Sequence, residues 1–372
     1  MKRIVISAVN IVEAGTLAIL RDCLAYLSNL AEKEDIEIIA VVHKKTLADF
    51  PNITYIETTW PKKRWTNRLW YEYVSLKKIS KEIAPVFLWF SLHDTSPSVI
   101  AKRRAVYCHN SYSFYRWKLH DLIFAPKIAL FAMFTKYIYK TNIHKNDYLV
   151  VQQNWFRVAM SKIFNLNKSR IIVAPAHLNK TITDTAAKAM NLDSFDTYQF
   201  LFPASPNSHK NFEVICKAAE LLENRNLSKP FKIVLTVSGT ENKYAAWLYK
   251  NWHHIQPIDF RGFVKKEELI ELYQQSNCLI YPSKVESWGL PISEFSAYNK
   301  PMLLADLPYA KETAAGSNKT AFFNPENAEK LAMLMENLIL GEDEALKPIP
   351  IQKIEEPLAN NWNELFTILM KE

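Results

Sequence analysis

Two carboxylates in the C-terminal third of the chain have a spacing that could place them in one binding site. Glu286 and Glu294 are separated by seven residues in the stretch "ESWGLPISE". The stretch follows "CLIYPS", whose apolar run is typical of a buried strand. Pro291 suits the first turn of a helix, where its missing N–H is no loss. We therefore predict a strand, a loop that carries Glu286, and a helix that starts near Gly289 and carries Glu294.

The predicted helix start is suited to an anion. Backbone N–H groups at Gly289 and Leu290 would point outward with the positive end of the helix dipole, which favours a phosphate or diphosphate. A glycine also lets the backbone approach a ligand closely. Glu286 and Glu294 could then reach different parts of one ligand. On spacing alone, a solvated acidic turn of a surface helix explains the two glutamates equally well.

A lysine stands at the start of another predicted helix. Lys210 ends the polar loop "ASPNSHK", which follows the strand-like run "QFLFP" and precedes the helical pattern "NFEVICKAAELL". A cation is unfavourable for the N-terminus of the helix itself but favourable for an anion bound there. In open α/β sheets ligands bind beyond the carboxyl ends of the strands, so we expect Lys210 on the same edge as Glu286. Simple solvation is the alternative for an isolated lysine.

The elements that must position these residues alternate along the whole chain. Short apolar runs such as "RIVISAV", "IEIIAVVH" and "CLIY" are separated by longer amphipathic stretches, and the stretch between the first two has leucine at every third or fourth position. Strands without polar alternation, each followed by a helix, indicate parallel sheets covered on both faces. We predict two doubly wound α/β domains, residues 1–178 and 179–350. Residues 351–372 are predicted to form a terminal helix that packs back toward the first domain.

The composition is that of a soluble globular protein. The chain has 372 residues, of which 49% are hydrophobic and 23% charged, so it is long enough for two domains. Its four cysteines show no CxxC or Cys/His ligand spacing, which favours free thiols in a reducing cytosol. The N-terminal apolar run is interpreted as a strand rather than a signal peptide. The apolar stretch 122–134 is too short for a transmembrane helix.

Positive charge is concentrated in the first half. Residues 1–180 carry 27 Lys and Arg against 13 Asp and Glu, a balance of +14, and residues 181–372 carry 19 against 25, a balance of −6. A basic half suggests that one domain faces an anionic ligand or surface, and ordinary solvation is the alternative. Aromatic residues accompany the basic ones in "WPKKRWTNRLWYEYVSLKK", a composition that suits an anionic membrane interface. The alternative is that the aromatic residues are core and the lysines face solvent.

The ordered set of motifs resembles a known family. "FPASPNSHKNFEVICKAAELL", "FRGFVKKEELIELYQQSNCLIYPSKVESWGLPISEFSAYNKPMLLADLP" and "AFFNPENAEKLA" resemble the donor domain of retaining family 4 glycosyltransferases over roughly residues 199–340. "YLVVQQNWFRVAMSKIFNLNKSRIIVAPAH" is similar to the segment that ends the acceptor domain of that family. The resemblance implies the GT-B fold, in which two Rossmann-like domains face a cleft. It also implies transfer of a sugar from a nucleotide-diphosphate sugar to a saccharide acceptor.

The resemblance implies a role for each matching residue of the donor domain. Glu294 would hold the ribose hydroxyls, because a carboxylate can accept two hydrogen bonds. Glu286 would contact the transferred sugar, and Lys210 with the N–H groups of Gly289 and Leu290 would neutralise the leaving diphosphate. The segment that contacts the base in this family matches two residues of this chain, Phe263 and Val264.

In the first domain the resemblance covers two positions. Gly15 matches the glycine loop beside the diphosphate, although this loop has one glycine where many relatives have more. His109 matches the histidine that reaches the sugar, and a structural histidine at a strand end is the alternative. Many relatives also carry an arginine where Ala204 stands. Ser205 is a candidate to supply the missing contact.

For several other polar residues the sequence does not decide between a functional and a structural role. His93 and Asp94 also follow a strand, where we expect a structural or acceptor-side role. A second set could bind an anionic acceptor or be solvated: Arg103, Arg104, Arg116 and Lys118. The chain has no Asp-x-Asp triplet, HExxH or P-loop, so we expect no metal and no cofactor.

We therefore predict a retaining hexosyltransferase that acts on a lipid-linked saccharide in capsule, O-antigen or lipopolysaccharide synthesis. It would be cytoplasmic and peripheral on the cytoplasmic face of the inner membrane, with an anionic membrane surface as partner. A soluble transferase or phosphorylase that acts on a small sugar is the alternative within enzymes. A non-enzymatic RNA-binding module is a further alternative, but no nucleic-acid motif supports it, so we expect no nucleic acid as partner.

Overall fold

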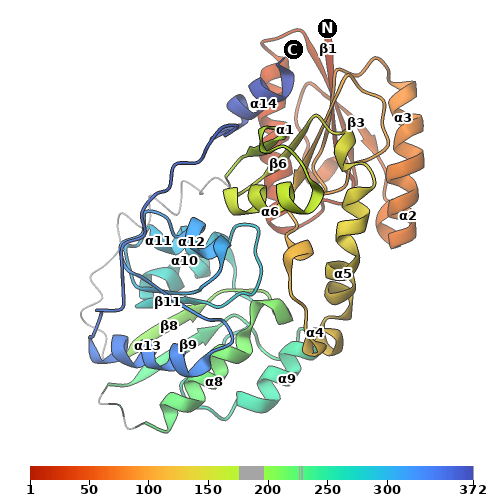
Figure 1. The fold of residues 1–372 in the computed structure, drawn as a ribbon. Coiled ribbons are helices and arrows are strands. Elements are labelled where there is room, and N and C mark those ends of the chain that lie inside the picture. The colour runs from red at the N-terminus through yellow and green to blue at the C-terminus, as the bar shows by residue number, and fades with distance from the viewer. Residues whose placement is uncertain (176–196, 226, 228, 372) are drawn as a thin grey trace. The chain divides into compact units, whose positions relative to one another are not determined.

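The structure is a computed structural model that describes residues 1–175, 197–225, 227 and 229–371. The chain forms two compact units (Figure 1). The first contains residues 1–113, 134–175 and 354–372, and the second contains residues 114–133 with the described part of 176–353. No helix among the described residues combines the length and the apolar character needed to cross a membrane.

The first unit is built on a parallel sheet of seven described strands. Their order is β3-β2-β1-β4-β5-β6-β7, and every pair is parallel. The order reverses at β1, which lies between β2 and β4, and such a switch point is where open α/β sheets bind ligands. The strands are β1 (Lys2–Ala8), β2 (Ile36–Val42), β3 (Ile53–Glu57), β4 (Leu88–Ser91), β5 (Arg103–Cys108), β6 (Tyr148–Val151) and β7 (Ile171–Val173).

Helices follow most of these strands, as parallel pairing requires. A five-residue π-helical turn, Tyr71–Ser75, joins α2 to α3. Helix α5 begins in the second unit and ends in the first. The helices are α1 (Ala14–Ala31), α2 (Trp65–Trp70), α3 (Leu76–Glu82), α5 (Pro126–Lys140), α6 (Asn154–Phe164) and α14 (Trp362–Met370), with short 3-10 turns at Lys45–Leu47, Trp60–Lys63, Tyr112–Phe114, Ile143–Lys145 and Lys168–Arg170.

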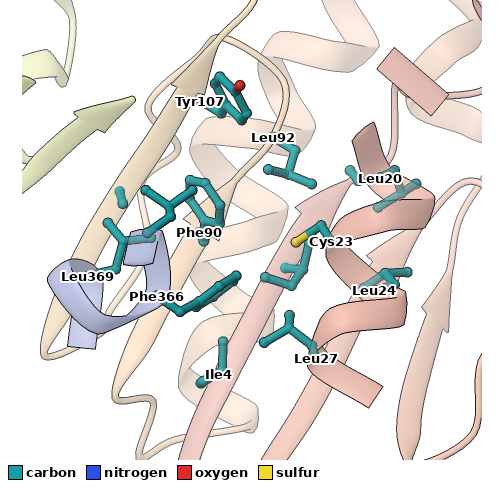
Figure 2. Packing of buried hydrophobic residues seen from close by; sticks show 14 of the residues in the cluster. Ile4, Leu20, Cys23, Leu24, Leu27, Phe90, Leu92, Tyr107, Phe366 and Leu369 are labelled. Carbon is teal, nitrogen blue, oxygen red and sulfur yellow. The ribbon is translucent and has the colours of Figure 1, made fainter. Parts of the chain in front are cut away.

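The core of the first unit shows why the leucine stripe predicts a helix. Leu20, Leu24 and Leu27 of α1 are buried against β1 and β4 (Figure 2). The terminal helix α14 lies beside α1 and completes this core (Figures 1 and 2). The Phe366 ring stacks on Tyr26 with centroids 5.5 Å apart and meets Phe90 edge-on at 5.9 Å. The last residues of the chain are therefore part of the first unit.

The second unit repeats the design with a parallel sheet of six described strands. Their order is β10-β9-β8-β11-β12-β13, with the reversal at β8. The strands are β8 (Tyr198–Phe202), β9 (Phe231–Leu235), β10 (Ile258–Phe260), β11 (Cys278–Tyr281), β12 (Met302–Ala305) and β13 (Thr320–Phe323). The helices are α4 (Leu119–Phe124), α8 (Phe212–Glu223), α9 (Lys243–Trp252), α10 (Lys266–Gln275), α11 (Leu290–Ser296), α12 (Pro308–Thr313) and α13 (Ala328–Leu340), with a 3-10 turn at Ser208–Lys210.

Two doubly wound parallel α/β units confirm the predicted fold class. One segment lies elsewhere than expected, because the predicted boundary at 178 assigns residues 114–133 to the first domain and the structure places them in the second unit. The reason is an aromatic contact: Phe124 of α4 packs on Tyr244 and Trp247 of α9, with ring centroids 5.9 and 5.1 Å apart. A stretch that is continuous in sequence with the first unit thus packs an aromatic residue against the second.

Candidate functional site

Lys210 and Glu286 meet at the switch point of the second sheet. Lys210 lies in the turn after β8, and Glu286 lies in the loop after β11. These two strands are neighbours, with Cys278 paired to Phe200. Adjacent parallel strands end at the same edge, so the sheet itself brings the two side chains together. The predicted proximity of these residues follows from this register.

The two side chains form an ion pair that Tyr281 supports. The ammonium group of Lys210 pairs with Oε1 of Glu286, and each side chain is only 14% exposed. The Tyr281 hydroxyl donates to the same oxygen at 3.2 Å and lies 3.5 Å from Lys210 Nζ. Burial, reinforced by the charge of Glu286, raises the pKa of Tyr281 well above its ordinary value, so that its hydroxyl stays protonated as a donor.

The turn that carries Lys210 is fixed by one asparagine. Asn211 follows the 3-10 turn with φ 63°, a left-handed conformation that asparagine tolerates better than most residues. Its buried side-chain amide donates to the carbonyls of Pro282 at 3.2 Å and Pro325 at 2.6 Å. The Lys284 N–H donates to the His209 carbonyl at 2.8 Å. The loops after β8 and β11 are therefore joined on both sides of the ion pair.

A buried carboxylate on α4 holds the same turn from the other side. Asp121 is 2% exposed and accepts hydrogen bonds from the hydroxyls of Ser208 and Tyr115, each at 2.7 Å. Its second oxygen accepts the backbone N–H of Lys118 at 2.8 Å. Ser208 is two residues before Lys210. Asp121 could not be identified from the sequence, because it lies 87 residues before Ser208 and no local pattern links the two.

Glu294 lies on α11 in a protected position. Its Oε2 accepts a hydrogen bond of 2.8 Å from the hydroxyl of Tyr273 on α10. Burial raises the pKa of Glu294, while the Tyr273 hydrogen bond and the charge of Lys266 act in the opposite direction. A carboxylate that is costly to ionise yet keeps one oxygen outside this hydrogen bond is suited to a ligand that donates hydrogen bonds.

Helix α11 begins where the sequence predicts. It runs from Leu290 to Ser296, with Pro291 in its first turn and Gly289 as N-cap. Gly289 has φ 92°, a conformation that side chains other than glycine rarely adopt. An added Cβ would also lie 3.2 Å from Cδ1 of Ile292. Glycine is therefore required here by backbone geometry, whether or not a ligand approaches it.

The remaining predicted donor residues lie on exposed loops. Phe263 is 86% exposed in the loop between β10 and α10, and Val264 next to it is half-buried. Ser205 is exposed, and its hydroxyl accepts the Asn207 amide at 2.9 Å. The N–H of Ala204 donates to the Thr236 hydroxyl at 2.9 Å. With this exposure, the Phe263 ring is accessible to a ligand.

The other two predicted residues lie in the first unit. Gly15 is exposed in the first turn of α1, which follows β1. His109 follows β5, and its ring packs on Tyr107 with centroids 4.3 Å apart. Both ring nitrogens are buried and make no hydrogen bond of normal geometry in the part of the chain that the structure describes. Burial lowers the pKa of His109, opposed by the charge of Asp94, which favours the neutral imidazole.

Asp94 and His93 have structural partners. Asp94 accepts the backbone N–H groups of His109 at 2.6 Å and Asn110 at 2.9 Å, so it fixes the loop that carries His109. The buried His93 contacts the Ser7 hydroxyl at 3.0 Å through Nε2 and Glu72 at 3.4 Å through Nδ1. These contacts agree with the structural interpretation of both residues.

Comparison with known proteins gives the class of the chain. Residues 187–353 match the family described as Glycosyl transferases group 1. The chain therefore contains a glycosyl transferases group 1 domain, and its two parallel α/β units have the GT-B fold of solved glycosyltransferases, as the sequence resemblance implies.

The individual relatives are distant. Over 330 residues the chain is 21% identical to the O-antigen chain mannosyltransferase RfbU of Salmonella typhimurium strain LT2, with 84% of each chain covered. The fold is similar to a glycosyltransferase from Rickettsia africae ESF-5, with a TM-score of 0.63, 19% identity and 92% and 90% of the two chains covered. It is also similar to the lipopolysaccharide outer core galactosyltransferase WaaB, with a TM-score of 0.62, 12% identity and 92% of each chain covered.

Replacing Glu294 by Gln should raise the free energy of unfolding at neutral pH. The pKa of Glu294 is higher in the folded chain than its ordinary value of 4.5, so its contribution to stability is fully present below pH 4.5 and is lost as pH rises through the folded pKa. Gln avoids this loss and can still accept the Tyr273 hydrogen bond. Urea denaturation from acid to neutral pH measures the difference, which should vanish at the acid end.

The matched control is Glu271→Gln on α10, an exposed glutamate that should change stability little at any pH. A Glu294→Gln protein that is less stable than the natural chain at neutral pH would contradict the argument.

Proposed function

We propose that the chain transfers a hexose from a nucleotide-diphosphate sugar to a saccharide acceptor with retention of configuration at the anomeric carbon. The observation that carries the proposal is the Lys210–Glu286 ion pair at the switch point of a group 1 glycosyltransferase domain. Retention is inferred from the sequence resemblance to retaining family 4 enzymes. No metal and no further cofactor are assigned to the reaction, because the sequence lacks the Asp-x-Asp triplet of metal-dependent transferases.

Departure of the leaving group is the difficult step. The bond between the anomeric carbon and the diphosphate oxygen breaks with its electron pair going to the diphosphate, and the sugar gains oxocarbenium character. Lys210 and the N–H groups of Gly289 and Leu290 would stabilise the negative charge that develops on the diphosphate. The acceptor hydroxyl then bonds to the same face of the sugar, and its proton goes to the departing diphosphate oxygen.

Glu286 and Glu294 have separate roles in this proposal. Glu294 accepts hydrogen bonds from the ribose hydroxyls, which its partly buried carboxylate supports. Glu286 contacts the transferred sugar once the diphosphate replaces it as the partner of Lys210. The base lies against Phe263 and Val264, and the exposed Phe263 ring supports stacking on it. Ser205 is an additional donor to the phosphate.

Two residues of the first unit complete the proposal. By the sequence resemblance, His109 contacts the transferred sugar and Gly15 lies beside the diphosphate. The His109 ring supports this role, because its two buried nitrogens make no hydrogen bond of normal geometry among the described residues. A neutral imidazole can donate to a sugar hydroxyl or accept from one, depending on its tautomer.

We infer that the product is a cell-surface polysaccharide such as O-antigen, lipopolysaccharide or capsule. The distant relative named as an O-antigen chain mannosyltransferase supports this inference. The acceptor is proposed to be lipid-linked, and the protein to be peripheral on the cytoplasmic face of the inner membrane. An apolar stripe on α5 supports membrane contact: Leu130, Phe134 and Tyr137 are 49%, 54% and 61% exposed at helical spacing.

A donor panel tests the proposed reaction. One nucleotide-diphosphate sugar should raise the melting temperature of the chain and be hydrolysed slowly without acceptor. Glu294→Ala should weaken its binding by about 100-fold, because hydrogen bonds from the ribose to a charged group are lost. Glu271→Ala, an exposed glutamate on α10, is the matched control and should bind normally. If no nucleotide sugar shifts the melting temperature, the proposed function is wrong.

Liposome flotation tests the membrane contact. The chain should float at low salt with vesicles that contain anionic lipid and much less with neutral vesicles. Phe134→Gln should reduce flotation several-fold, because it removes exposed apolar area from the stripe. The control Leu340→Gln changes a residue of similar exposure, 49%, on α13 of the second unit. Full activity on a soluble acceptor with no flotation would favour the soluble transferase instead.

A further inference from the structure

The first unit has a cavity that none of the candidate site residues lines. Its volume is about 420 Å³, within the roughly 300–1,000 Å³ range of small-molecule sites. It lies beyond the carboxyl ends of β2 and β3, since its lining residues belong to the segments that end or follow these strands. The lining residues are His43, Lys44, Thr46, Glu57, Thr58, Thr59 and Trp60.

The indole of Trp60 is held in place while part of it stays accessible. Its ring meets Tyr71 edge-on, with centroids 5.6 Å apart and planes at 87°. Its backbone carbonyl accepts the Asn67 amide at 3.1 Å. The side chain is nevertheless 37% exposed. A fixed, accessible aromatic face beside hydroxyl and carboxylate groups suits the apolar face of a sugar ring, with the polar groups at its hydroxyls.

The charges around the cavity favour an acidic ligand. Lys44 lines it, and Lys62, whose ammonium group also lies 4.0 Å from Oε1 of the exposed Glu13, is close enough that both lysines, together with burial, lower the pKa of His43. The negative charge of Glu57, which also lines the cavity, is partly compensated, because its Oε1 accepts a hydrogen bond of 2.7 Å from the backbone N–H of Lys45. The buried Nδ1 of His43 has no hydrogen-bond partner among the described residues, which leaves one polar contact for a ligand.

The cavity is too far from His109 to hold the acceptor sugar that reacts. In the strand order β3-β2-β1-β4-β5, the cavity lies at the β3 and β2 end and His109 follows β5. With neighbouring strands about 4.8 Å apart, roughly 15 Å of sheet edge separates them. That is more than one sugar ring spans, so a ligand in the cavity would be a part of the acceptor several units away from the hydroxyl that attacks.

We propose that the cavity at the ends of β2 and β3 binds a remote acidic unit of the acceptor, a sugar that carries a carboxylate or a phosphate. This proposal rests on the proposed glycosyl transfer and adds the chemical class of the acceptor. Trp60 stacks on the ring of the acidic sugar, and Glu57, Thr58 and Thr59 bind its hydroxyls. The anion lies between Lys44 and Lys62. The enzyme thereby selects acceptors that are longer than one sugar and negatively charged.

Binding to the full-length protein tests the proposal with four probes. Methyl β-D-glucuronide and mannose 6-phosphate carry the two kinds of anion, methyl β-D-glucoside is neutral, and inorganic phosphate lacks the ring. Dissociation constants come from tryptophan fluorescence, and saturation-transfer NMR identifies bound ligands. At least one acidic sugar should bind about tenfold more tightly than the glucoside and phosphate, because each of these supplies only part of the contacts. The stronger of the two acidic sugars identifies the anion.

Matched variants locate the binding. Trp60→Ala should weaken binding of the acidic sugar about fivefold, as should Lys44→Gln combined with Lys62→Gln. Trp65→Ala and Lys78→Gln should leave it unchanged, because Trp65 is 41% exposed in the same region and neither residue lines the cavity. Equal binding of neutral and acidic sugars, or binding indifferent to Trp60 and the two lysines, overturns the proposal.

The donor measurement separates this proposal from the proposed function. The residues proposed to bind the nucleotide sugar, those of the second unit together with Gly15 and His109, do not line the cavity, so the Trp60 and lysine variants should keep the full donor-induced shift of the melting temperature. A normal donor shift together with no acidic-sugar binding overturns the cavity proposal alone. An absent donor shift in the natural chain contradicts the proposed function, whatever the cavity binds.

Discussion

The ion pair between Lys210 and Glu286 is the interaction on which the candidate site depends. Each partner is mostly removed from water, and removing one partner of such a pair is costly because the other charge is then left uncompensated. A dianionic diphosphate can replace Glu286 as the partner of Lys210 without leaving the lysine unpaired. The resting pair thus keeps the cation in place and prevents the site from holding an unpaired charge before the donor arrives.

The surrounding structure serves to hold this pair at the edge of the sheet. Neighbouring strands β8 and β11 bring the two loops together, Asn211 joins them, and Asp121 on α4 ties the lysine turn to a segment from the first half of the sequence. Rigid support of this kind is what electrostatic stabilisation of a leaving group requires, because donors fixed in advance need no reorganisation during the reaction. At the start of α11 the positive φ of Gly289 would strain any other residue, so the backbone geometry there requires glycine.

The sequence predicted the features that local patterns encode. Apolar strands and the leucine stripe of α1 gave the two parallel sheets, and Pro291 located the start of α11 within a residue. The proximity of Lys210 and Glu286 could also be predicted, because both residues follow strands of one sheet, but the specific contacts that hold this site could not. Asp121 meets Ser208 because α4 contacts the turn after β8, and Tyr273 meets Glu294 because its hydroxyl reaches from α10 to α11; no local sequence pattern encodes either contact. The division at residue 178 missed the transfer of α4 to the second unit for the same reason, since Phe124 finds its aromatic partners 120 or more residues further along the chain.

The central claim is that a diphosphate replaces Glu286 as the partner of Lys210. A crystal structure of the chain with a bound nucleoside diphosphate tests this claim most directly. The account predicts that Lys210 Nζ leaves Glu286 for a diphosphate oxygen, while the ribose hydroxyls donate to Glu294 and Glu286 is left facing the position of the transferred sugar. A nucleotide bound elsewhere, or bound at α11 with Lys210 still paired to Glu286 alone, would contradict it.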